Sequence, residues 1–70
     1  MKVYTERMRL RMLELVFDAR ALAAATGLSV STVNKALRGE IIRPLTVGKI
    51  SKALEVDPAA LILEDTRDEG

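Results

Sequence analysis

The chain has 70 residues with no cysteine and no histidine, and its 11 basic and 10 acidic residues leave a formal net charge of +1. This length fits one domain near the lower limit for a self-sufficient core, and the missing residue types exclude disulfides and the common zinc sites. One tyrosine, one phenylalanine and no tryptophan make the interior aliphatic, which together with frequent alanine and leucine favours helices. Because no apolar run could span a bilayer and no signal-type segment follows Met1-Lys2, we expect a cytoplasmic protein without a membrane contact.

The basic residues are concentrated in the first three quarters of the chain. Residues 1–52 contain ten Lys or Arg and four acids, for a net charge of +6, whereas residues 53–70 contain one Arg and six acids, for a net charge of −5. A basic body suits a polyanion, and an acidic end would point away from it. We expect residues 1–63 to form the domain and the polar, acidic residues 64–70 to be a frayed tail or a linker.

Residues 1–17 allow two interpretations. Met8, Met12 and Leu15 fit one face of a helix that has Thr5 as its N-cap. Residues 7–12 alternate basic and apolar side chains with period two, which would also suit a strand. Because β-branched residues are few, we favour the helix.

The next segment has clear helix start and stop signals. Asp18 can accept hydrogen bonds from the free N–H groups of a helix that begins at Ala19, and residues 19–25 are mostly strong helix formers. Gly27 is expected to end this helix, because glycine adopts a left-handed conformation without steric cost.

A second helix follows after a very short turn. Ser29 is its expected N-cap, Val33 and Leu37 fall on one face at i,i+4 spacing, and Gly39 is its expected terminator. Residues 18–39 therefore predict a helix, a short glycine turn and a second helix.

Two further helices are expected after an irregular segment. Pro44 disfavours helix at the preceding residue, after which Thr46 can cap a helix over residues 47–54. Asp57 is the expected N-cap of a last short helix that continues to residue 63, with proline at its first position.

Residues 18–39 resemble the helix-turn-helix of the lambda-repressor-like (Cro/repressor, XRE-type) DNA-binding proteins, and residues 29–39 are also similar to the recognition helix of the lac-repressor relatives. The positions that carry the resemblance are Leu22, Ala23, Gly27, Leu28, Ser29 and Val33. The resemblance implies an all-α, compact bundle of about five short helices. It also implies a sequence-specific, double-stranded-DNA-binding transcription regulator encoded by a bacterium, phage or plasmid. A repressor is the expected role, and the DNA-binding part of a larger regulator is the alternative. For the motif itself, the alternative is that it is a purely structural αα-hairpin that binds no ligand.

The resemblance also assigns roles on the second helix, which would lie in the major groove. The usual base readers are at the positions of Val30, Ser31 and Lys35. Val30 can contact a thymine methyl group, Ser31 can donate or accept a hydrogen bond, and Lys35 can donate hydrogen bonds to guanine. The residues expected near the DNA backbone are Ser29, Thr32, Asn34 and Arg38, and further candidates for phosphate contacts are Arg43, Thr46 and Arg20.

The chain both matches and departs from the family pattern outside this helix. Arg43-Pro44 resembles the family's loop, in which a basic residue before proline holds the DNA backbone. Phe17 resembles the apolar residue that precedes the first helix of the helix-turn-helix. The first family helix could place either Met8 with Met12 or Leu10 with Leu13 in the core. Ala19 stands where the family often has a phosphate-binding glutamine, and Glu55 where it usually has glycine.

The C-terminal end has more apolar residues than one short helix needs. We expect that they either close the core or make a homodimer contact; the residues are Val56, Leu61, Ile62 and Leu63. A dimer would place two recognition helices in successive major grooves, about 34 Å apart, on a palindromic operator.

Other classes of function have weaker support. The chain has no glycine-rich phosphate loop and no nucleophile beside a base, so we expect neither catalysis nor a cofactor, metal or small-molecule ligand. The main alternative to DNA binding is a protein-interaction module, such as an antitoxin that binds a partner protein.

Overall fold

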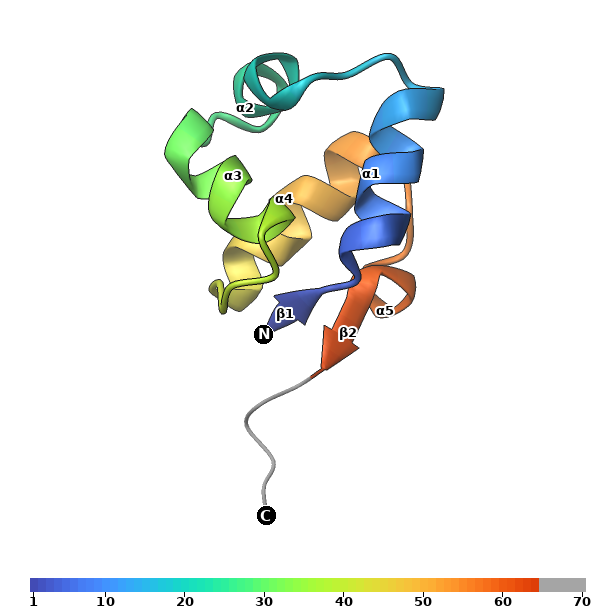
Figure 1. Cartoon of the computed structure of the whole chain (residues 1–70), viewed down its shortest axis with the longest axis vertical. Coiled ribbons are helices and arrows are strands. Elements are labelled where there is room, and N and C mark those ends of the chain that lie inside the picture. Colours follow the sequence, from blue (N-terminus) through green and yellow to red (C-terminus); the bar gives the residue numbers. More distant parts are fainter. Residues whose placement is uncertain (65–70) are drawn as a thin grey trace.

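The structure, a computed structural model, describes residues 1–64, and the N-terminal and C-terminal strands of this part lie side by side (Figure 1). The elements of the described chain are β1 (Lys2–Val3), α1 (Thr5–Glu14), α2 (Ala19–Thr26), α3 (Val30–Leu37), α4 (Pro44–Leu54), α5 (Pro58–Leu61) and β2 (Ile62–Glu64). The expected bundle of about five short helices is confirmed, while the two-stranded sheet was not predicted. Of the expected tail, Glu64 belongs to β2 and residues 65–70 lie outside the described residues.

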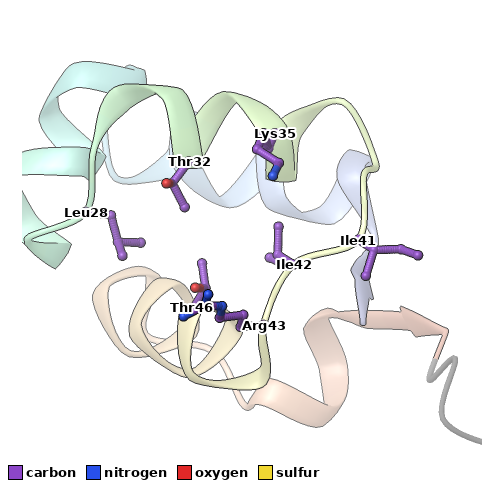
Figure 2. Close-up of a pocket in the computed structure, with 7 residues that line it drawn as sticks. All are labelled: Leu28, Thr32, Lys35, Ile41, Ile42, Arg43 and Thr46. Carbon is purple, nitrogen blue, oxygen red and sulfur yellow. The ribbon is translucent and has the colours of Figure 1, made fainter.

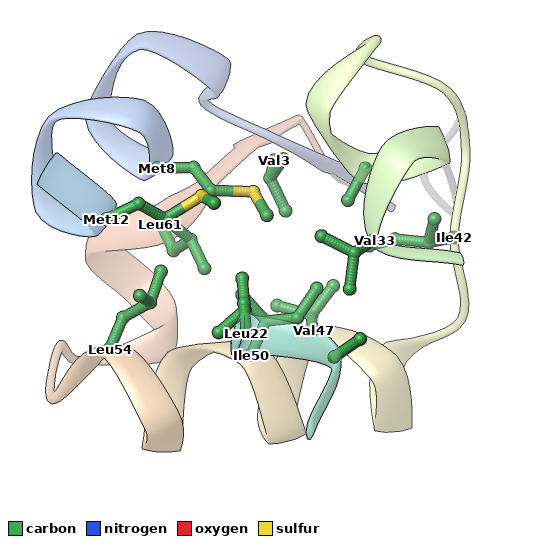
Figure 3. Packing of buried hydrophobic residues seen from close by; sticks show 12 residues of the cluster. Val3, Met8, Met12, Leu22, Val33, Ile42, Val47, Ile50, Leu54 and Leu61 are labelled. Carbon is green, nitrogen blue, oxygen red and sulfur yellow. The ribbon is translucent and has the colours of Figure 1, made fainter. Parts of the chain in front are cut away.

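The core consists of aliphatic and methionine side chains contributed by each helix, β1 and the α3–α4 loop (Figure 3). Its buried members are Val3, Met8, Met12, Leu22, Ala23, Val33, Ala36, Ile42, Val47, Ile50, Leu54 and Leu61. Met8 and Met12 are buried whereas Leu10 and Leu13 are exposed, which decides the register of α1. Leu15 and Phe17 are half-buried and pack against this core.

The caps of the two central helices are confirmed. The Asp18 carboxylate accepts a hydrogen bond from the Ala21 N–H at 2.8 Å, and the Ser29 hydroxyl accepts one from the Thr32 N–H at 3.1 Å. Gly27 ends α2 with a φ of 76°. Local side-chain chemistry therefore sets the length of both helices and of the turn between them.

Two predicted helix starts are wrong. Thr5 is the first residue of α1 rather than its cap, because the Tyr4 N–H donates to the Leu61 carbonyl at 2.7 Å and holds Tyr4 extended. Helix α4 begins at Pro44, so Thr46 lies within its first turn. Proline favours this position because its fixed φ is helical and a first helical N–H would lack a partner in any case.

The last predicted helix is too long. Asp57 caps α5 by accepting from the Ala59 N–H at 2.9 Å, as expected, but the helix ends at Leu61. The chain then becomes β2, which pairs antiparallel with β1 and sets Ile62 opposite Val3. Backbone hydrogen bonds to β1 therefore replace the helical ones that residues 62 and 63 were expected to make.

Helices α1, α3 and α4 end in the same backbone pattern. In each, an N–H just beyond the helix donates to the carbonyl five residues earlier: Phe17 to Met12, Glu40 to Lys35, and Val56 to Ser51. This closure places one residue in the left-handed region, namely Val16 (φ 59°), Gly39 (φ 77°) and Glu55 (φ 59°). Glycine suits such a position, whereas a β-branched valine there is strained.

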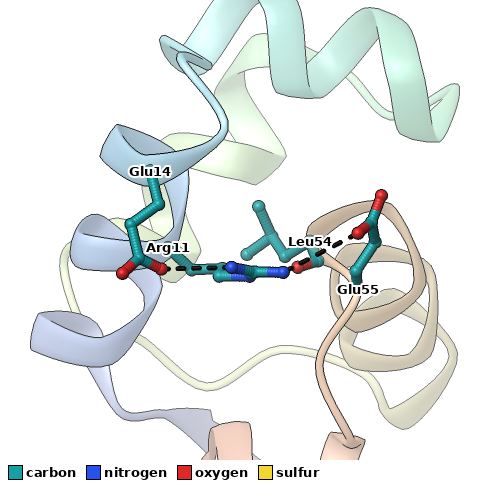
Figure 4. Close-up of polar contacts among 4 residues, drawn as sticks. All are labelled: Arg11, Glu14, Leu54 and Glu55. Atoms are coloured by element: carbon teal, nitrogen blue, oxygen red, sulfur yellow. Dashed lines mark hydrogen bonds and ion pairs between the residues drawn. The ribbon is translucent and has the colours of Figure 1, made fainter.

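Three alternating arginines of α1 bind the C-terminal ends of three other helices. Arg7 donates to the Ala60 carbonyl at 2.8 Å, Arg9 to the Leu37 carbonyl at 2.9 Å, and Arg11 to the Leu54 carbonyl at 2.7 Å. Figure 4 shows that the Arg11 guanidinium lies between the carboxylates of Glu14 and Glu55, at 3.1 and 3.7 Å. The period-two charge pattern of α1 thus reflects contacts with helix ends and not a strand.

Candidate nucleic-acid interface

Helix α3 presents a polar outer face because its apolar side chains are turned inward. Val33 and Ala36 are fully buried, and Leu37 is half-buried against the core. Ala36 rather than Leu37 is therefore the second fully buried residue of this helix. The candidate base readers Val30, Ser31 and Lys35 are all exposed on α3, so the predicted recognition surface is accessible.

The candidate backbone contacts differ in exposure and in their present partners. Ser29, Arg38, Arg43 and Arg20 are exposed, while Thr32, Asn34 and Thr46 are half-buried. The Ser29 and Thr32 hydroxyl oxygens lie 2.9 Å apart. The Arg38 guanidinium donates to the Glu40 carboxylate at 2.6 Å, so Arg38 already has an anionic partner on the same surface.

A groove of about 480 Å³ separates α3 from the first turn of α4 (Figure 2). Its lining comes from the α2–α3 turn, α3, the α3–α4 loop and α4: Leu28, Thr32, Lys35, Ile41, Ile42, Arg43 and Thr46. In Figure 2, Thr32 and Lys35 extend from α3 toward the side of the groove that carries Arg43 and Thr46. The structure therefore brings one predicted base reader and three predicted backbone residues to a single groove.

The lining of this groove suits an anion. It combines two cationic side chains, Lys35 and Arg43, with the hydroxyls of Thr32 and Thr46. Donors and positive charge are what a phosphate oxygen requires. Arg43, the residue before α4, makes no side-chain capping bond within the described chain, so the first-turn amides of this eleven-residue helix add donors at the same end.

The apolar part of the groove was not predicted from the sequence. Ile42 is buried and joins the core, while Ile41 beside it is exposed. The Ile42 N–H donates to the Met1 carbonyl at 2.8 Å, and the Met1 amino group donates to the Ile42 carbonyl at 3.1 Å. This pairing with the N-terminus holds the α3–α4 loop in place, and nothing in the local sequence indicates it.

The predicted dimer residues do not form one surface. Leu61 is only 2% exposed, and Val56 and Ile62 are half-buried against the core, whereas Leu63 is exposed. Assigning Leu61 to a dimer contact is therefore wrong for this fold, because its side chain fills the core of its own chain (Figure 3).

Two capped helices joined at a left-handed glycine, with a polar outer face on the second helix, define a helix-turn-helix DNA-binding protein. A family model described as Helix-turn-helix matches residues 8–61, which is well over half of the chain. The chain therefore belongs to the lambda-repressor-like, XRE-type helix-turn-helix family, a family of DNA-binding regulators and not of enzymes.

None of the curated proteins and none of the solved structures matches the chain. In residues 1–64, no helix has the length and apolar character needed to cross a membrane.

Proposed function

We propose that this protein is a sequence-specific transcriptional repressor that acts as a homodimer on a palindromic operator. The observation that carries the proposal is the position of the cationic groove of Lys35 and Arg43 directly beside the exposed face of α3. A helix in the major groove reads base edges, and neighbouring cations hold the phosphates that flank it.

Base reading is assigned to three exposed residues of α3. Val30 contacts a thymine methyl group, Ser31 donates to or accepts from a base edge, and Lys35 donates to guanine O6 and N7. None of these is the bidentate arginine or glutamine that gives strong discrimination at one base pair. A single half-site is therefore read with modest specificity, which is why a second copy on a second half-site is part of the proposal.

Backbone binding is assigned to residues around this face. The groove residues Thr32, Arg43 and Thr46 bind one phosphate, and the remaining contacts come from Ser29, Asn34, Arg38 and Arg20. About four neutralised phosphates per protomer give a dimer a slope of roughly −7 for the logarithm of affinity against the logarithm of salt concentration.

The test is the selection of bound sites from a random duplex pool, followed by binding measurements across salt concentrations. The proposal predicts an enriched palindrome and a steep loss of affinity with salt. A single asymmetric site would contradict the dimer. Absence of a salt-dependent shift on any duplex would contradict DNA binding and favour a protein-interaction module such as an antitoxin.

A further inference from the structure

The outer face of α1 and the turn after it expose three large apolar side chains, Leu10, Leu13 and Val16, beside the half-buried Phe17. We name these four residues the α1 face. Leu10 is 57% exposed, Leu13 74% and Val16 87%, while Phe17 is half-buried. Leu10 and Leu13 are neighbours on one side of the helix because they are three residues apart. Contiguous exposed apolar residues on a small protein mark an interaction surface more often than single ones do.

The α1 face has shape as well as apolar character. Leu13 and Phe17 together line two hollows of about 420 Å³ each. The first hollow is completed by residues of α1, α2 and α3, namely Arg9, Met12, Ala19 and Leu37. The second is completed by Val16, Asp18 and Ala21. The surface therefore alternates projecting apolar side chains with depressions that similar side chains could fill.

The most exposed of these side chains stands on a strained backbone, which the hydrogen bond from the Phe17 N–H to the Met12 carbonyl holds in place. Val16 has a φ of 59°, in the left-handed region, at a helix end where Gly27 and Gly39 serve the same purpose in α2 and α3. For a β-branched residue this conformation is a genuine outlier, and such strain is often found at functional sites. The stability of the isolated chain does not explain a strained valine that projects into water.

The charges at the two ends of the α1 face indicate what covers it. Arg9 lines one hollow and Asp18 lines the other, so opposite charges flank a common apolar centre at Leu13. A two-fold axis near Leu13 would bring Arg9 of one copy toward Asp18 of the other, and Leu10 toward Val16. Each charged group keeps bonding capacity, because Arg9 uses one N–H on Leu37 and Asp18 one oxygen on Ala21.

We propose that the α1 face is the surface through which two copies of this chain pair, with their α1 helices antiparallel. This pairing surface rests on the proposed function, because it would supply the dimer that binds a palindromic operator. Its residues are distinct from those of the groove beside α3, and α1 and α3 lie on the right and the left of Figure 1. The face has fewer residues than a standard interface, so pairing is weak, with a dissociation constant of about micromolar or higher.

The experiment is sedimentation equilibrium of the full chain without DNA, up to about 1 mM protein. The wild type is expected to show a monomer–dimer equilibrium, which Leu13→Glu weakens at least about 100-fold, because a charge would be buried at the two-fold centre. Leu45→Glu is the matched control, since Leu45 is 70% exposed on α4. Leu63→Glu tests the C-terminal end, and neither of these two variants should change pairing.

Val16→Gly separates pairing from folding. Relief of the left-handed strain should raise the thermal midpoint by a few degrees at a concentration where the protein is monomeric, while loss of the side chain weakens pairing about tenfold. Glu55→Gly, which relieves the same conformation at the end of α4, should leave pairing unchanged. Unchanged or tighter pairing of Val16→Gly would overturn the proposal.

Three further results would also overturn it: a wild type that is monomeric at every concentration, a Leu13→Glu variant that still pairs, and a Leu63→Glu variant that does not pair. Binding of Leu13→Glu to a random-sequence duplex at low salt is measured in parallel. If this variant binds DNA but the wild type never pairs, the pairing surface is wrong and DNA binding stands. If the wild type pairs but binds no duplex, the pairing surface stands and the proposed function fails.

Discussion

The arginines of α1 and the cations beside the groove have the same charge but different surroundings. Arg7, Arg9 and Arg11 each donate to a carbonyl at the end of another helix, so their charge offsets the negative end of a helix dipole. Lys35 and Arg43 instead line a groove with hydroxyl groups. A count of basic residues therefore overstates the surface that is available to a polyanion, because part of that charge is used within the fold.

The sharpest test of this difference removes both groove cations. The double variant Lys35→Ala/Arg43→Ala should lose about 2 to 4 kcal/mol of DNA-binding free energy, because one base contact and one phosphate contact are lost together. Fluorescence anisotropy on a labelled duplex measures it, and the thermal midpoint should stay near that of the wild type. Lys49→Ala/Lys52→Ala is the control with the same charge change on the exposed side of α4. An equal loss in this control would refute a specific role for the groove.

The two groove cations should differ from each other in sequence preference. Lys35→Ala should cost about 1 to 3 kcal/mol on the preferred site and flatten the preference at one base pair. Arg43→Ala should weaken binding to all sequences alike and make the salt slope of the dimer shallower by about two, one for each protomer. Binding profiles over a set of single-base variants of the selected site measure both effects. If the two variants gave the same profile, the separate roles assigned to Lys35 and Arg43 would be wrong.

An arginine of α1 should affect stability and not DNA binding. Arg11→Met keeps the aliphatic stem but removes the donor to the Leu54 carbonyl, which should lower the free energy of unfolding by about 1 to 2 kcal/mol. Urea denaturation measures this loss. The folded variant should keep the salt slope of the wild type, and Arg20→Met, at an exposed arginine of α2, should keep its stability. A stable Arg11→Met variant with weakened DNA binding would mean that Arg11 serves DNA binding and not the stability of the fold.

The smallest expected effect concerns Arg38, which has an anionic partner beside the proposed DNA-binding face. Glu40→Gln removes the carboxylate that Arg38 contacts at 2.6 Å, so DNA affinity should rise by roughly two- to fivefold at low salt. Because exposed ion pairs contribute little, stability should change by less than about 0.5 kcal/mol. Glu6→Gln has the same charge change at an exposed position of α1. An equal rise there would mean that net charge alone is responsible.

The features predicted correctly from the sequence depend on residues close together in the chain. Asp18 and Ser29 each bond a backbone N–H three residues away, and Gly27 needs only its own conformational freedom. The predictions failed where distant segments compete for the same residues. Thr5 is not the cap because the Tyr4 N–H donates to the Leu61 carbonyl, and residues 62 and 63 are not helical because they belong to the strand that pairs with β1.

The candidate site also has one part that local sequence predicts and one part that it does not. The exposed face of α3 follows from the helical period, because burying Val33 turns Ser31 and Lys35 outward, while Val30 is exposed at the first position of the helix. The groove could not be predicted, because it needs α3 and the first turn of α4 at a fixed distance. That distance depends on the buried Ile42 and on its two backbone bonds to Met1.

The sequence by itself determined the two capped helices, the glycine turn and the family, because caps and turns are made by contacts within a few residues. Only the tertiary structure decided that Met8 and Met12, and not Leu10 and Leu13, enter the core. It also decided which basic residues bind helix ends and which remain at the groove. The physical reason is that burial and carbonyl partners come from segments far away in the chain, and the local sequence does not indicate where those segments will lie.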